Sequence, residues 1–175
     1  LIDWLNLEDL FHLDGATINH RQSTYLRAVI SSNVTMFYWR VAGAHDGIQL
    51  MEWVRMRKMN FRSMRLKLQT EEELNAFVLL AESNCFDRVE VLDLTSSSYL
   101  VSRLKDKHLL SLLAKCRGTL KELRLSPHSP RLTGECVSQI GKCSKLEVFN
   151  PSVSILPSFP QLEPQCFPKL RNVNI

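Results

Sequence analysis

Apolar residues recur along this sequence in a fixed local pattern. A second apolar residue follows the first after three positions, and the last position of the pattern, two residues further on, is apolar in every copy except one, where it is Pro. The six copies are Val34-x-x-Phe37-x-Trp39, Phe61-x-x-Met64-x-Leu66, Val89-x-x-Leu92-x-Leu94, Leu120-x-x-Leu123-x-Leu125, Leu146-x-x-Phe149-x-Pro151 and Leu170-x-x-Val173-x-Ile175. Their starts lie 27, 28, 31, 26 and 24 residues apart. Such a period is typical of a solenoid, in which each unit buries its apolar face on the next unit. We therefore expect one short strand in each unit.

The segments between these strands carry helical patterns. Thr70 followed by Glu73 forms a capping box, and apolar residues at helical spacing then predict a helix from 71 to about 84. The other expected helices run from Asp106 to Cys116, from Thr133 to Gly141 and from about Asp46 to Arg57, with Asp106 and Thr133 as N-caps. Each unit is thus expected to be a strand, a turn and a helix.

This order of elements predicts an α/β fold. Parallel strands would line the concave side of a right-handed solenoid, and helices would line its convex side. We expect residues 34–175 to form this array, with units starting near 34, 61, 89, 120, 146 and 170. The first 33 residues lack a strand pattern and predict two short helices, near 7–13 and 21–31, that either cap the array or form a separate docking module.

The end of the sequence departs from the regular pattern. Prolines occupy positions 151, 157, 160, 164 and 168, so the unit that starts near 146 is expected to have an irregular back side without a full helix. The pattern resumes at Leu170 and stops within a strand at Ile175. Because the sequence also lacks an initiator Met, we expect a fragment cut at both ends, with the repeats truncated at the C-terminus.

Four of the five cysteines recur at one phase of the pattern. They lie three or four residues before a strand start, and they are Cys85, Cys116, Cys143 and Cys166. A cysteine at a fixed phase is expected to be a small buried residue that fills the turn between helix and strand. Reduced thiols favour an intracellular protein, either cytoplasmic or nuclear.

The pattern L-x-x-L-x-L resembles the leucine-rich repeats, and most closely the cysteine-containing type found in F-box/leucine-rich-repeat proteins. The resemblance is carried by the two units that run from Leu104 through Cys116 to Leu125 and from Leu132 through Cys143 to Val148. It implies the solenoid architecture described above. It also implies a function in binding other proteins.

The segment from Trp4 to Leu13 resembles the middle of an F-box. In that family, such a segment packs against the Skp-type adaptor of a cullin ubiquitin ligase. The resemblance implies that the docking residues would be Leu5, Leu7, Leu10 and Leu13. An amphipathic helix that only caps the array would show similar leucines, so both interpretations stay open.

Charge and hydropathy exclude several classes of function. The net charge is +4, and most of the basic excess lies between Arg55 and Lys67, which we interpret as a solvated face of one unit. Nucleic-acid binding would require more charge and a recognisable motif, so no nucleic acid is expected as a partner. No apolar run approaches the roughly 18 residues of a membrane span, so no membrane contact is expected either.

No pattern of a catalytic, cofactor or metal site is present. The five histidines are scattered without zinc spacing, and glycine-rich phosphate loops are missing. Cys136 is the one cysteine outside the repeat phase, and packing explains it better than nucleophilic catalysis does. We therefore expect a protein that is not an enzyme and needs no cofactor.

The candidate binding residues flank the buried positions of the strands, because side chains alternate between the two faces of a strand. They are Tyr38, Arg40, Arg65, Lys67, Asp93, Thr95, Arg124, Ser126 and Asn150. Tyr38, Arg65, Asp93, Arg124, Asn150 and Asn174 are expected to form one row across the sheet. Tyr and Arg are frequent interface hot spots, which favours a protein partner. Alternatively, Arg65, Asp93 and Arg124 only pair with one another along the sheet.

Two functions follow from these predictions. The chain could be the substrate-recognition part of an F-box/leucine-rich-repeat ubiquitin-ligase subunit, with the concave face selecting the target protein. Alternatively, it is a generic leucine-rich-repeat scaffold without a link to ubiquitin ligation.

Overall fold

The computed structural model describes residues 7–16, 37–38, 44–65, 68, 70–95, 106–125, 133–150 and 169–173. Within these ranges the chain forms helices and one parallel sheet, which makes the fold α/β. The predicted helix over 21–31, the segment at 151–168 and the candidate residues Arg40, Lys67 and Ser126 lie outside the described residues.

Six strands form the sheet, and each lies within one of the predicted segments. They are β1 (Phe37–Tyr38), β2 (Ser63–Arg65), β3 (Val91–Asp93), β4 (Glu122–Arg124), β5 (Val148–Asn150) and β6 (Asn172–Val173). Their order in the sheet is their order in the sequence, and every neighbouring pair is parallel. The predicted parallel sheet is confirmed.

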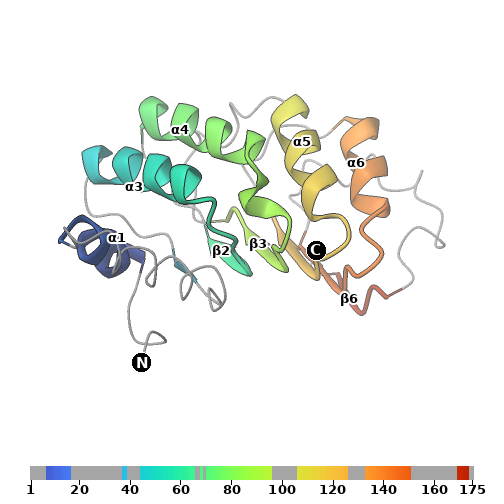
Figure 1. The fold of residues 1–175 in the computed structure, drawn as a ribbon. Coiled ribbons are helices and arrows are strands. Elements are labelled where there is room, and N and C mark those ends of the chain that lie inside the picture. The colour runs from blue at the N-terminus through green and yellow to red at the C-terminus, as the bar shows by residue number, and fades with distance from the viewer. Residues whose placement is uncertain are drawn as a thin grey trace.

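The described α-helices number five, and four of them form a layer on one side of this sheet. The five are α1 (Leu7–Ala16), α3 (Ala44–Arg57), α4 (Glu71–Glu82), α5 (Asp106–Cys116) and α6 (Gly134–Gly141), with a short 3-10 helix, η1 (Asn84–Phe86). Figure 1 shows α3 to α6 side by side above the strands, whereas α1 lies below α3, which it contacts, at the N-terminal end of the array. The expected separation of strands and helices into two layers is therefore confirmed.

The capping box predicted at the start of α4 is present. The backbone N–H of Glu73 donates to Oγ1 of Thr70 at 3.2 Å, and the backbone N–H of Thr70 donates to the Glu73 carboxylate at 3.1 Å. The helix ends at Glu82, two residues earlier than expected. Ser83 adopts an extended conformation, and its hydroxyl accepts a hydrogen bond from the N–H of Cys85, which starts the 3-10 turn.

The other helix ends agree less closely with the predictions. The prediction that Asp106 is an N-cap is wrong, because Asp106 is already the first residue of α5. Thr133 does precede α6, but its side chain makes no capping hydrogen bond. The ends predicted at Cys116, Gly141 and Arg57 are observed.

The core lies between the sheet and the helices. Two stacks of strand-side residues, each with at most 1% exposure, run along it: Phe61, Val89, Leu120 and Leu146 form the first, and Met64, Leu92, Leu123 and Phe149 form the second. The helices contribute Phe77, Leu113 and Ile140, among others, to the same continuous cluster. Because each of these units buries the apolar residues at the same two strand positions, the strands pair in a common register.

Three of the four phased cysteines are buried where a helix leads into a strand, as predicted, and Cys166 lies outside the described residues. Cys85, Cys116 and Cys143 are each at most 1% exposed, and none forms a disulfide. The thiol of Cys116 donates to the carbonyl oxygen of Leu112 at 3.3 Å, which ties it to the last turn of α5. Burial raises the pKa of Cys116 to about 12 and that of Cys143 to about 11. Both thiols are thus protonated and serve as packing groups.

Candidate functional site

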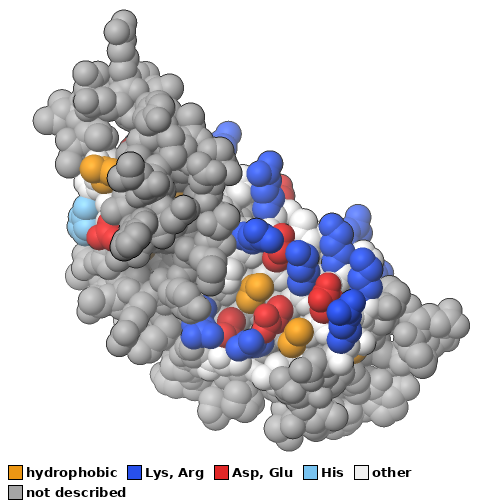
Figure 2. All heavy atoms as spheres, turned by 90° about the horizontal axis from the view of Figure 1, so that it is seen from below, with side chains coloured by type: hydrophobic (Ala, Val, Ile, Leu, Met, Phe, Trp, Pro, Cys, Tyr) orange, Lys and Arg blue, Asp and Glu red, His pale blue; other side chains and the backbone are white. Residues whose placement is uncertain are grey.

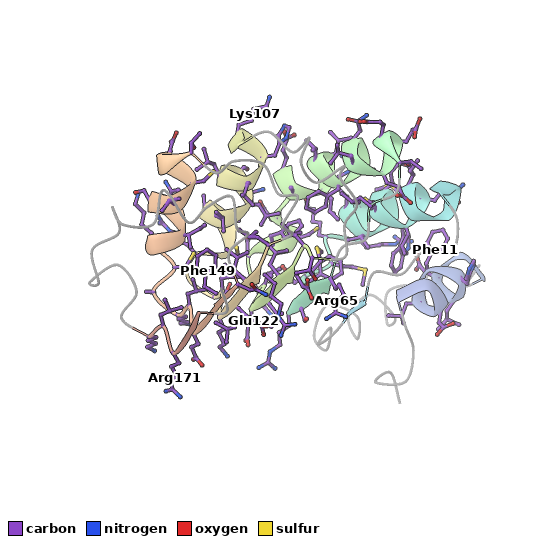
Figure 3. All side chains as sticks on the ribbon, turned by 180° about the vertical axis from the view of Figure 1, so that it is seen from behind. Phe11, Arg65, Lys107, Glu122, Phe149 and Arg171 are labelled. Atoms are coloured by element: carbon purple, nitrogen blue, oxygen red, sulfur yellow. The ribbon has the colours of Figure 1, made fainter. Side chains whose placement is uncertain are left out.

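The face of the sheet opposite the helices carries mostly polar side chains, most of them partly exposed. We call it the open face and define it by Ser63, Arg65, Val91, Asp93, Glu122, Arg124, Val148 and Asn150. In each strand these residues flank one fully buried residue, as the alternation of a pleated strand requires. In Figure 3, Arg65 and Glu122 lie on the side of the strands away from the helices. No described helix covers this face, which Figure 2 shows from below.

The predicted row across the sheet is in register. Tyr38 is paired with Arg65, Arg65 with Asp93, Asp93 with Arg124, and Arg124 with Asn150. Neighbouring strands lie about 4.8 Å apart, so the five positions span roughly 19 Å. For Tyr38 the structure describes only the backbone position, and Asn174 lies outside the described residues.

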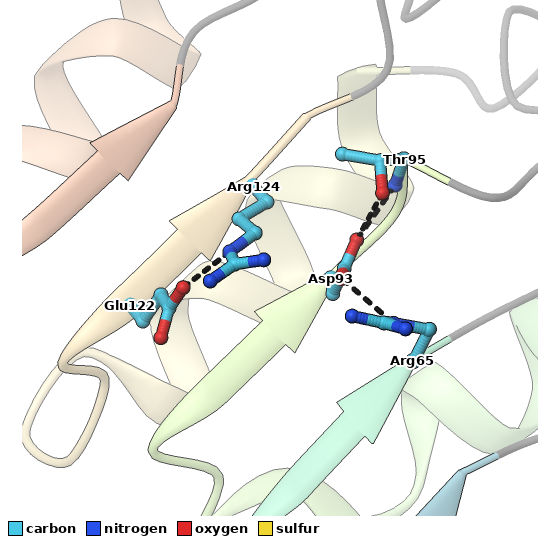
Figure 4. A network of polar contacts seen from close by, with 5 residues as sticks. All are labelled: Arg65, Asp93, Thr95, Glu122 and Arg124. Carbon is cyan, nitrogen blue, oxygen red and sulfur yellow. Dashed lines mark hydrogen bonds and ion pairs between the residues drawn. The ribbon is translucent and has the colours of Figure 1, made fainter. Parts of the chain in front are cut away.

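Asp93 is the centre of a hydrogen-bond network on this row. The Arg65 Nε–H donates to Oδ2 of Asp93 at 2.8 Å, and Thr95 donates to Oδ1 from its backbone N–H at 2.9 Å and its hydroxyl at 2.6 Å (Figure 4). Only 3% of Asp93 is exposed. Burial alone would raise the pKa of this carboxyl, but the hydrogen bonds from Thr95 and Arg65 together outweigh it and hold the pKa below its ordinary value.

Acid should therefore destabilise this network. Because the folded-state pKa of Asp93 is depressed, its contribution to stability is present above the ordinary pKa of 3.8 and is lost as the pH falls through the folded-state value. We expect the free energy of unfolding to fall between about pH 5 and pH 2, and to fall less in Asp93→Asn. Urea titrations at several pH values measure both slopes. Glu135→Gln, at an exposed position of α6, is the control and should keep the wild-type slope.

Arg124 does not pair with Asp93. Its Nε–H donates to the carboxylate of Glu122, two residues earlier on the same strand and the same face (Figure 4). The alternative in which Arg65, Asp93 and Arg124 pair in one line is correct only for Arg65 and Asp93. No described residue bonds to the terminal amino groups of Arg124, whose side chain is 43% exposed. Arg124 is thus held in place while its donors face outward.

A second row of charges, which the sequence analysis did not identify, lies where the strands begin. Glu90 bridges two cations: Arg62 Nε lies 3.1 Å from Oε1, and Lys121 Nζ lies 2.7 Å from Oε2. The hydrogen bond from Lys121 is the main reason that the pKa of Glu90 is below its ordinary value. The row continues as Glu147 and Arg171, and the alternation of sign at the second residue of the last five repeats could have revealed it.

Helix α1 is fastened to α3 by a buried polar contact. Asp14 accepts hydrogen bonds from Trp53 Nε1 at 2.7 Å and from Arg57 Nε at 2.9 Å, and its side chain is 4% exposed. The ring of Phe11 meets that of Trp53 edge-on, with centroids 5.6 Å apart. These contacts join residues 39 and 43 positions apart, so local sequence patterns did not predict them.

The four leucines assigned to adaptor docking have different environments. Leu10 is 1% exposed and belongs to the core cluster, whereas Leu13 is 42% exposed. Leu7 begins α1, where the structure describes only the backbone, and Leu5 lies outside the described residues. Leu10 is thus already used to seat α1 on the rest of the fold, and Leu13 is the one shown on the surface.

Other chemistry is not apparent in the described part of the chain. No group of three or more His, Cys, Asp or Glu side chains there could hold a metal ion. Cys136 is fully buried. None of the helices within the described ranges is long and apolar enough to cross a bilayer.

We compared the chain with models of known protein families, with curated proteins and with solved structures. None of the three comparisons found a match.

Proposed function

We propose that this chain is a leucine-rich-repeat solenoid that binds a protein partner on its open face. Three observations support the repeat architecture. The strands follow one another in sequence order in a parallel sheet, the units are 24 to 31 residues long, and Cys85, Cys116 and Cys143 are buried at equivalent places between helix and strand. Stacked units of this length are the design of leucine-rich repeats.

The observation that carries the binding function is the fixed orientation of charged groups on the open face. Arg65 is held by Asp93, and Arg124 is held by Glu122, so both guanidinium groups are positioned before a partner arrives. Pre-ordered arginines lose less side-chain entropy on binding than free ones do. A face of this width suits a protein surface or an extended peptide, whereas small ligands prefer concave pockets.

The chemistry of the face also indicates what it would contact. Both carboxylate oxygens of Asp93 accept hydrogen bonds within the fold, so Asp93 holds Arg65 and Thr95 in position. Arg124 offers N–H donors, and Asn150 offers both a donor and an acceptor. The complementary partner surface would present carboxylates or backbone carbonyls opposite Arg124.

Replacing Arg65 and Arg124 together by Glu should abolish capture of the partner. We expect at least about a tenfold loss, because truncating a hot-spot residue typically costs 2 kcal/mol or more. The measurement is quantitative mass spectrometry of proteins retained from a cell lysate by the immobilised chain. Folding of the variant is checked by circular dichroism.

The matched control replaces Arg55 and Lys107 by Glu. Both residues are exposed on the helix side, and both double variants lower the net charge from +4 to 0. The proposal fails if a folded variant with both open-face substitutions retains the same proteins as the wild type, or if the control loses them equally.

Ubiquitin-ligase adaptor function is the more specific prediction, and the packing of α1 favours its alternative. Leu10 is enclosed in the core and Asp14 fastens the helix to α3, so α1 has a capping function that needs no adaptor. The link to a ligase therefore requires Leu13 and residues outside the described ranges. Retention of a purified Skp-type adaptor, and its loss in Leu13→Asp, would support the ligase link; no retention by the wild type would favour the scaffold.

A further inference from the structure

Basic residues accumulate along one edge of the molecule, where the chain enters the strands. We call this the basic edge and define it as residues 58–62, 87–90, 117–121, 142–147 and 169–171, which lead into β2 to β6. Its cations are Lys58, Arg62, Arg88, Arg117, Lys121, Lys142, Lys145, Lys169 and Arg171. Figure 2 shows Lys and Arg side chains gathered along one border of the open face.

The charge of this edge exceeds that of the whole chain. Its nine cations are opposed by three acids, Asp87, Glu90 and Glu147, which gives a net charge of +6 compared with +4 for all 175 residues. Of the basic excess that the sequence places between Arg55 and Lys67, only Lys58 and Arg62 belong to this edge. Folding therefore joins five separate short segments into one surface of positive potential.

The five segments lie in a continuous line. The N–H of Glu90 donates to the carbonyl of Arg62 at 2.7 Å, and the N–H of Lys121 donates to that of Glu90 at 2.7 Å. The same hydrogen bond recurs from Glu147 to Lys121 at 2.7 Å and from Arg171 to Glu147 at 2.9 Å. At the usual strand spacing of about 4.8 Å, the line is roughly 19 Å long.

Most of these cations form no ion pair within the described part of the chain. Arg62 and Lys121 share Glu90, but seven others form no ion pair with any described residue: Lys58, Arg88, Arg117, Lys142, Lys145, Lys169 and Arg171. All seven are exposed. Like charges on one edge repel one another in the free protein. An anionic ligand would relieve this repulsion, and each unit of the edge would contribute favourable electrostatic energy to its binding.

Helix dipoles explain only part of this arrangement. Cations are favourable at the C-terminal end of a helix, and Lys58, Arg117 and Lys142 each directly follow one. The same effect does not apply to Arg88 and Lys145, which lie beyond the ends of α4 and α6. It does not apply to 169–171 either, a segment that follows no described helix. These remaining cations require another explanation.

We propose that the basic edge binds an acidic segment of a protein, rich in Asp and Glu. This surface is distinct from the open face, so the inference goes beyond the function proposed above. The charge of the edge is complementary to such a segment, and an extended peptide of about six residues would cover its length. Single-stranded nucleic acid is disfavoured, because the described residues of the edge expose no aromatic ring on which bases could stack.

The test is fluorescence anisotropy with a labelled peptide of ten glutamates, and a labelled ten-nucleotide oligo-dT for comparison. In Arg88→Gln/Lys145→Gln, which lowers the net charge to +2, we expect the affinity for the peptide at low salt to fall roughly fivefold. The control Lys107→Glu has the same net charge and should bind nearly as the wild type does. Lys107 lies in the first turn of α5, and this end of the helix is far from the strands. Arg171, in contrast, lies at the basic edge (Figure 3).

Four results would overturn this assignment, three of them from the binding measurements above. These three are equal weakening in both variants, tighter binding of oligo-dT than of the peptide, and no binding of the peptide by the wild type at low salt. The first would mean attraction by net charge only, and the second would assign the edge to nucleic acid. The variant Arg65→Glu/Arg124→Glu separates the two surfaces: weaker peptide binding than in Arg55→Glu/Lys107→Glu would place the peptide on the open face.

Discussion

Replacing Phe86 by Ala should lower the free energy of unfolding by about 4 kcal/mol, because the substitution leaves a cavity in the core. Phe86 is fully buried in the 3-10 turn after α4. Its ring meets that of Phe77 edge-on, with centroids 6.1 Å apart, so the aromatic contact is lost together with the buried area. Chemical denaturation, followed by circular dichroism, measures the change.

The control for this prediction is Leu79→Ala in the adjacent helix. Leu79 is 51% exposed, so its truncation should change stability by about 0.5 kcal/mol or less. A loss below about 1 kcal/mol for Phe86→Ala would contradict the enclosed position of the ring between α4 and the strands.

Removing the carboxylate of Asp14 should lower the free energy of unfolding by about 2 kcal/mol. In Asp14→Ala, the indole N–H of Trp53 and the guanidinium of Arg57 lose a common acceptor in a site where water has little access. A buried donor left without its partner costs about 1–3 kcal/mol, and more when it is charged. Arg57 is 30% exposed on its side chain, so it can partly recover by hydration.

Asp14→Asn distinguishes the two contributions of this carboxylate. The amide oxygen can still accept the hydrogen bond from Trp53 but no longer carries the charge that attracts Arg57. We therefore expect a loss smaller than that in Asp14→Ala. Equal losses would show that the ion pair alone fastens α1, and no loss in either variant would show that α1 is held by Leu10 and Phe11.

The strands and most helices could be predicted because their determinants are local. Burial of the first and fourth positions, such as Phe61 and Met64, leaves a recurring mark in the sequence. The capping box at Thr70 spans only three residues and sets where α4 begins. The N-cap predicted at Asp106 is wrong because an Asp is favourable both as a cap and in the first turn, and the sequence cannot distinguish the two positions.

The candidate face was predictable in its register but not in its pairing. Alternation along each strand placed Arg65, Asp93 and Arg124 in one row. Their partners depend on competition: Thr95 and Arg65 already occupy both oxygens of Asp93, so Arg124 pairs with Glu122 instead. Asp93 is predicted to contact a partner, whereas in the structure its side chain is buried. That a protein partner binds this face stays a prediction.

The sequential order of the strands has a consequence for how the chain finds its fold. Each strand pairs only with the strand before it and the strand after it, so every pairing closes a loop of similar and modest length. Loop-closure entropy rises only slowly with length, and no step has to join distant parts of the chain. Ordering can thus begin in one unit and spread to the next. The same property lets such a chain gain or lose a unit in evolution while the neighbouring units keep their contacts.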